Sequence, residues 1–107
     1  MIDRNADIFQ MVKDIDCANH CMGANAGSIR IEHVGSESDS LAGPQAASSA
    51  ALFRWLLQKH QIPRTNALRP RFHAGPQTTG RNSCPNKLFG HVHSQATIAA
   101  WVATNVN

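Results

Sequence analysis

The sequence predicts an α/β domain in which helices flank a small mixed β-sheet. Three features support this class: residues 28–35 alternate between apolar and polar side chains, and two later stretches, starting near Pro44 and Ser94, show apolar residues at helical spacing. No internal repeat and no linker divides the chain, and 107 residues fit one domain, so residues 1–107 are expected to form a single unit.

The β-structure is expected in three places. Residues 2–12 predict a hairpin, with a polar turn at residues 3–7 between Ile2 and the apolar run that follows. Residues 28–35 are the strongest strand candidate, because Ile29, Ile31 and His33 share one face while Glu32 lies on the other with Ser28, Arg30 and Val34. Residues 67–73 predict a short extended segment, and Pro70 places it at a sheet edge.

Two helices are expected. Pro44 suits the first turn of a helix, where its missing N–H has no partner to lose, and Pro63 ends that helix. Its apolar stripe consists of Ala46, Ala50, Phe53, Leu56, Leu57 and His60. A second helix over residues 94–106 would begin with Ser94 as N-cap and face inward with Ile98, Trp101, Val102 and Val106.

Composition narrows the functional class. Hydrophobic content of 42% and charged content of 16% are typical of a globular chain, and no apolar run approaches the length of a membrane span. We expect no signal peptide, because Met1 is followed by neither a basic nor an apolar region. The net charge of +3 favours an anionic polymer such as a cell wall, whereas the lack of Tyr and of a stacking platform argues against nucleic acid.

One pair of residues is a candidate for metal binding. His73 and Cys84 lie eleven positions apart across a loop rich in Gly and Pro, and both side chains are zinc ligands. The alternative is a structural His and a small buried Cys. Cys17 and Cys21 either form a disulfide or lie buried, and the odd total of three cysteines argues against a fully paired framework.

Four motifs follow one another along the chain: "IDRNADIFQ" at residues 2–10, "A-x-H" from Ala18 to His20, "N-x-x-SIRIE" from Asn25 to Glu32, and "H…CP" from His73 to Pro85. In this order they resemble the type 2, zinc-dependent N-acetylmuramoyl-L-alanine amidases, the superfamily that includes peptidoglycan recognition proteins and phage endolysins. The hairpin "IDRNADIFQ" at residues 2–10 is similar to the family's "IDRDG-x-I-x-Q". Ala18 and His20 match its "A-x-H" turn, and "N-x-x-SIRIE" from Asn25 to Glu32 matches its "N-x-x-SIGIE" strand. The fourth motif is the late "H…CP" segment from His73 to Pro85, and the whole resemblance covers residues 2–89.

The resemblance implies a site. His73 and Cys84 would be two of three protein ligands to zinc, and Glu32 would be the general base. His20, Asn25 and Asn82 would line the substrate groove. The plainer alternatives are a Glu32 that is paired with Arg30 or solvated, and a His20 at the surface.

Three departures from the family pattern accompany the match. The family's third zinc ligand is a His on an N-terminal strand, and a helix separates that strand from the hairpin. We expect this chain to be a form of the domain that is truncated before the hairpin. The open sheet edge left by the missing strand would then lead either to self-association or to low stability as a monomer. Arg30 replaces a Gly and brings a cation beside Glu32, which would weaken it as a base, and uncharged Asn82 occupies a position that is often basic.

The leading hypothesis is therefore a peptidoglycan amidase of the cell wall or extracellular space, or one encoded by a phage. It would cleave the amide between N-acetylmuramic acid and L-alanine. The alternatives are a non-catalytic peptidoglycan-binding or regulatory domain with an incomplete metal site, and a truncated product without a function of its own.

Overall fold

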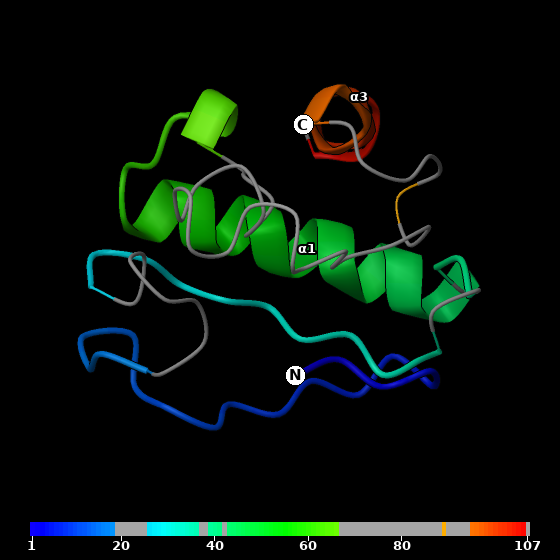
Figure 1. Cartoon of the computed structure of the whole chain (residues 1–107), viewed down its shortest axis with the longest axis horizontal. Coiled ribbons are helices and arrows are strands. Elements are labelled where there is room, and N and C mark those ends of the chain that lie inside the picture. Colours follow the sequence, from blue (N-terminus) through cyan, green and yellow to red (C-terminus); the bar gives the residue numbers. More distant parts are fainter. Residues whose placement is uncertain (19–25, 37–38, 42, 67–88, 90–94, 107) are drawn as a thin grey trace.

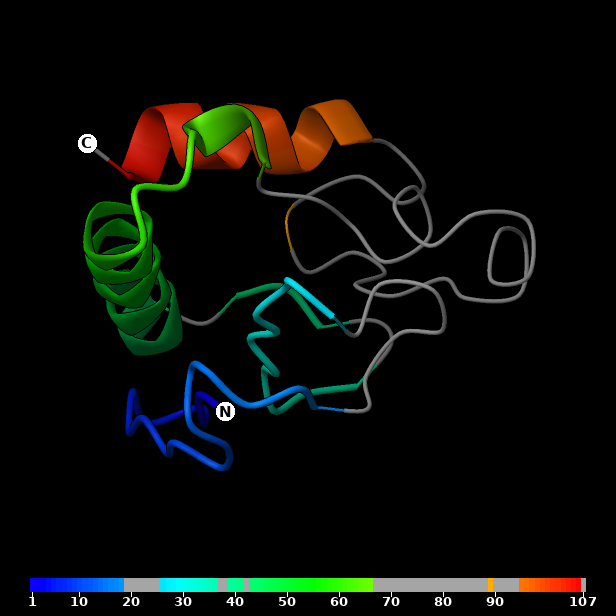
Figure 2. The same ribbon diagram turned by 90° about the vertical axis from the view of Figure 1, so that its left-hand side faces the viewer.

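The structure is a computed structural model that describes residues 1–18, 26–36, 39–41, 43–66, 89 and 95–106. Its helices are α1 (Gly43–Lys59), the short 3-10 helix η1 (Arg64–Asn66) and α3 (Gln95–Asn105). α1 lies between the N-terminal segments and α3, and the axes of α1 and α3 cross steeply (Figures 1 and 2). None of the helices in these ranges is long and apolar enough to cross a membrane.

The predicted mixed β-sheet is wrong for the part of the chain that the structure describes, which contains helices and no β-strand. Ile2 alone forms isolated bridges, antiparallel to Ile8 and parallel to His33. The polar turn predicted at residues 3–7 is present: the Asp3 carboxylate accepts hydrogen bonds from the backbone N–H groups of Asn5 and Asp7, both at 2.9 Å, and the Asp3 N–H donates to the Asp7 carbonyl at 3.0 Å. The alternation in residues 28–35 therefore marks faces of an extended segment, and the expected edge segment at residues 67–73 lies outside the described residues.

Polar side chains on the first two turns of α1 donate hydrogen bonds to backbone carbonyls of the segments that were expected to form the sheet. The Gln45 amide nitrogen donates to the backbone carbonyls of Ile2 (3.2 Å) and Val34 (3.1 Å), and the Gln45 side chain is fully buried. One turn along, the Ser48 hydroxyl donates to the Ala6 carbonyl at 2.8 Å. Polar side chains of α1 thus donate hydrogen bonds to backbone carbonyls of the N-terminal layer, which consists of the described residues that precede α1 (1–18, 26–36 and 39–41).

The opposite face of α1 is apolar and packs against α3. Ile98, Val102 and Val106 are buried there, in contact with Ala50, Phe53, Leu57, Phe89 and Trp101. The inward positions predicted for the last helix are confirmed, with Trp101 half-buried between Phe53 and Phe89 at ring distances of 5.7 and 5.1 Å. Each fully buried Val or Ile contributes about 1.5–3 kcal/mol, so this cluster is the main apolar core of the described residues.

α1 ends in a Schellman motif. The N–H of Ile62 donates to the Leu57 carbonyl at 2.9 Å and the N–H of Gln61 to the Gln58 carbonyl at 3.3 Å. Gln61 has a φ of 53°, in the left-handed region that costs a residue with a Cβ about 1–2 kcal/mol. Pro63 then prevents the helix from continuing, as predicted.

The substitution Gln61→Gly is expected to raise the free energy of unfolding by about 0.5–1 kcal/mol, because glycine adopts this conformation without the Cβ clash. Gln58→Gly, three residues earlier and inside α1, is the matched control and should lower it by about 1 kcal/mol. Chemical denaturation of the three proteins checks both signs. A destabilised Gln61→Gly protein would contradict this account of the helix end.

Candidate functional site

Glu32, the expected catalytic base, lies at the surface of the N-terminal layer. Its backbone carbonyl accepts a hydrogen bond from the N–H of Ile2 at 2.8 Å, so the main chain at this position is fixed. Its side chain is 57% exposed, and its Oε2 atom lies 2.7 Å from Nη2 of Arg30. The carboxylate can therefore meet a ligand from solvent, but the neighbouring guanidinium holds it in an ion pair.

His33, which matched no motif, is the polar anchor of the same segment. Its Nε2 lies 2.8 Å from the hydroxyl oxygen of Ser49 on α1, and its ring stacks edge-on against Phe89 at 5.8 Å. Burial lowers the pKa of His33 from 6.5 to about 4, the N-terminal amine adds to that effect, and Glu32 opposes it. Because Ser49 is fully buried, this pair serves as a structural link and not as a hydrolytic dyad.

The alternation of apolar and polar side chains in residues 28–35 indicated that His33 would form a hydrogen bond inside the fold. It placed His33 on the apolar face, and a His on that face is one that the fold must satisfy by hydrogen bonding. Ser49 carried no such signal, because a Ser in the middle of a predicted helix is usually solvated.

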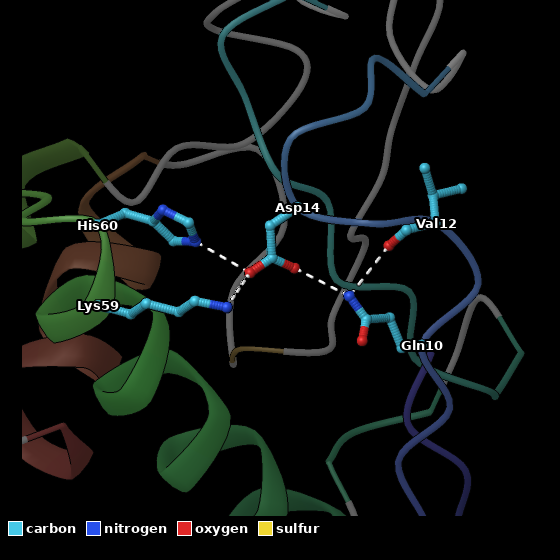
Figure 3. A network of polar contacts seen from close by, with 5 residues as sticks. All are labelled: Gln10, Val12, Asp14, Lys59 and His60. Atoms are coloured by element: carbon cyan, nitrogen blue, oxygen red, sulfur yellow. Dashed lines mark hydrogen bonds and ion pairs between the residues drawn. The ribbon is translucent and has the colours of Figure 1, made fainter.

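A second polar cluster joins the N-terminal layer to the end of α1. Oδ2 of Asp14 lies 2.8 Å from Nζ of Lys59 and 3.0 Å from Nε2 of His60, while Oδ1 accepts from the Gln10 amide at 3.0 Å (Figure 3). The pKa of Asp14 is lowered, mainly by the hydrogen bond from Lys59 and then by that from His60. Both carboxylate oxygens are engaged, so the cluster acts as a clamp between the loop and α1. It also shows that His60, expected in the apolar stripe, makes a polar contact instead.

The described ranges contain no group of three His, Cys, Asp or Glu side chains that could hold a metal ion. The expected zinc ligands and groove residues all lie outside those ranges; they are His20, Asn25, His73, Asn82 and Cys84. Of the two cysteines expected either to pair or to lie buried, Cys17 is a free, exposed thiol, and Cys21 lies outside the described residues. Of the expected site residues, the structure describes Glu32, which forms an ion pair with Arg30. The zinc site stays a prediction.

Comparison with known proteins gives one match. A family model described as N-acetylmuramoyl-L-alanine amidase matches residues 1–87. No curated protein and no solved structure matches the chain. The matched range contains Glu32 and the five expected site residues outside the described ranges, whereas α3 follows it.

Acid is expected to destabilise the fold through His33. Its folded-state pKa of about 4 lies below the unfolded value of 6.5, so the unfolded chain binds an extra proton between these values. The free energy of unfolding should therefore fall by about 2–3 kcal/mol as the pH drops from 6.5 to 4. His33→Gln keeps a hydrogen-bonding group near Ser49 without a titratable ring and should flatten this decline. Urea unfolding at a series of pH values measures the slope, and equal slopes in both proteins would refute the assignment.

Proposed function

The chain belongs to the N-acetylmuramoyl-L-alanine amidase family, and on this basis we propose that it hydrolyses the amide between the lactyl group of N-acetylmuramic acid and the L-alanine of the stem peptide in peptidoglycan. The observation that carries the proposal is the family match over residues 1–87, which includes every residue that the proposed site uses. A peptidoglycan substrate agrees with the net charge of +3, because the stem peptides of the wall carry carboxylates. The proposed setting is the cell wall or extracellular space, or a phage-encoded enzyme.

His73 and Cys84 are the proposed zinc ligands. Imidazole nitrogen and thiolate sulfur are both donors that zinc takes, so the chemistry of this pair fits the ion. Zinc held there would polarise the amide carbonyl and make a water molecule acidic enough to attack near neutral pH.

Glu32 is the proposed general base. An exposed carboxylate on a fixed backbone can take a proton from the attacking water and pass it to the leaving amine of L-alanine. To do so it must release or share the ion pair with Arg30, so Arg30 is proposed to compete with the water molecule for this carboxylate. His20, Asn25 and Asn82 are proposed to line the groove, where Asn82 can donate a hydrogen bond to the substrate.

The Arg30–Glu32 pair also supports a second candidate function, a peptidoglycan-binding or regulatory domain without catalysis. The Glu32 carboxylate is already engaged by the Arg30 guanidinium at 2.7 Å, so it is not free to orient an attacking water molecule. In this alternative the groove residues and the metal pair serve binding alone. The two candidates differ in whether new amino termini appear when the protein meets peptidoglycan.

Metal binding by the proposed pair can be measured directly. The protein purified with micromolar zinc should carry a substantial fraction of one zinc per chain, and His73→Ala should reduce it to near zero because a lost ligand is only partly replaced by water. His60→Ala is the control, since it removes one imidazole from the Asp14 cluster and should retain the metal. A wild-type protein without zinc under these conditions would contradict the proposed ligands.

Catalysis by Glu32 is tested with purified peptidoglycan. Glu32→Gln should lower the release of amino termini about 10²–10⁴-fold while binding to peptidoglycan is retained, because the shape stays and the base is lost. Asp7→Asn removes an exposed carboxylate and should leave the rate unchanged. Arg30→Ala, which removes the ion-pair partner, should raise the rate.

The same assay decides between the two candidates. A wild-type protein that binds peptidoglycan and releases no amino termini would establish the non-catalytic alternative. Equal rates for the wild type and Glu32→Gln would exclude Glu32 as the base.

A further inference from the structure

The charges of this chain are segregated along the sequence. Residues 1–39 contain all seven Asp and Glu residues and three of the ten Lys and Arg residues. Residues 40–107 contain the other seven basic residues and no acidic residue. Because α1, η1 and α3 all belong to this second part, the helical side of the molecule offers basic side chains and no acidic ones.

A cavity lies within this basic part, where the C-terminal half of α1, η1 and the end of α3 meet. It has a volume of about 200 Å³ and is lined by Arg54, Leu57, Gln58, Ile62, Arg64 and Val106. Figure 2 shows η1 beside α3, above the end of α1. Among the described residues, the lining comes from α1, η1 and the segments that follow α1 and α3.

The lining has two kinds of surface. Arg54 on α1 and Arg64 on η1 are exposed basic residues of the lining. Leu57 and Ile62, both half-buried, form an apolar floor, to which Val106, only 1% exposed, adds little accessible surface. The backbone beneath is held by the Schellman motif that joins Leu57 to Ile62, so the floor is preformed.

We propose that this cavity, the Arg54–Arg64 pocket, binds the carboxylate of a short peptide end together with the small aliphatic side chain next to it. A guanidinium matches a carboxylate with two parallel hydrogen bonds, and the apolar floor accepts a methyl group. Pockets for whole drug-sized ligands have volumes of about 300–1,000 Å³, so this one suits about a single residue and excludes a disaccharide.

The identity of the ligand rests on the proposed function. If peptidoglycan is the substrate, the matching group is a stem-peptide terminus that ends in D-alanine. A single site of this size and exposure should bind only in the millimolar range. A wall with many stem peptides would still retain the protein, because rebinding at neighbouring termini raises the effective concentration.

The test is a titration of the full chain with N-acetyl-D-alanyl-D-alanine, followed by amide chemical shifts. The backbone signals of Leu57, Ile62 and Val106 should move, with a Kd of about 1 mM. Arg64→Gln should weaken binding about tenfold and Arg54→Gln by several-fold, because each removes a charged donor. Lys13→Gln, an exposed basic residue of the N-terminal layer, controls for net charge and should bind like the wild type.

Two further ligands make the proposal specific. The C-terminal amide of the same dipeptide should bind at least tenfold more weakly, and equal shifts with acid and amide would overturn the carboxylate assignment. Glycerol 3-phosphate tests a phosphate group as the source of the anion, and tighter binding of this ligand at the same residues would overturn the peptide assignment.

The titration requires neither zinc nor hydrolysis. An inactive protein whose pocket binds the dipeptide would leave the pocket proposal standing without the amidase proposal. An active enzyme whose pocket residues do not respond would overturn the pocket alone.

Discussion

The described part of this fold depends on one buried carboxamide. Ile2 donates its N–H to the Glu32 carbonyl, and its own carbonyl accepts from the N–H of Val34 and from Gln45. Gln45 also donates to the Val34 carbonyl, so a single side chain links the segment around Ile2 to the segment around Val34. Without Gln45 the Ile2 carbonyl would keep the Val34 N–H, whereas the Val34 carbonyl would lose the donor that Gln45 supplies, and a buried carbonyl left without a donor costs about 1–3 kcal/mol.

This arrangement also decides where the candidate base can be. The backbone carbonyl of Glu32 accepts a hydrogen bond from the N–H of Ile2, and the ring of the next residue, His33, is hydrogen-bonded to Ser49 on α1. With the chain fixed on both sides and His33 directed inward, the side chain of Glu32 must project outward. Its exposure is therefore a consequence of packing, and the ion pair with Arg30 follows because residues two apart on an extended segment share a face.

Sequence periodicity was sufficient for the helices and insufficient for the sheet. Apolar residues at helical spacing located both helices, and Ile98, Val102 and Val106 proved to be buried as predicted. Alternation in residues 28–35 identified the faces correctly at His33, but it carries no information about a pairing partner, and the bridge found in this segment is the isolated one between His33 and Ile2. Gln45 and Ser49 gave no signal, because the pattern of a helix does not show that a polar residue faces a layer of unpaired backbone. The metal and groove residues came from resemblance to a family, since the spacing of His73 and Cys84 alone is equally compatible with a structural His and a buried Cys.

The segregation of charge gives the two sides of α1 different relations to an anionic polymer. Residues 1–39, which include Glu32, contain all the acidic residues of the sequence and repel such a polymer, whereas the helical side attracts it. At physiological ionic strength the screening length is about 8 Å, and the shortest dimension of the molecule is 24 Å. Each side therefore responds mainly to its own charges, and attraction on the helical side can offset the repulsion that a wall would meet at Glu32. Salt should accordingly weaken attachment to the wall while leaving the hydrogen bonds that fix Glu32 unchanged, because those bonds join backbone groups that do not depend on long-range charge.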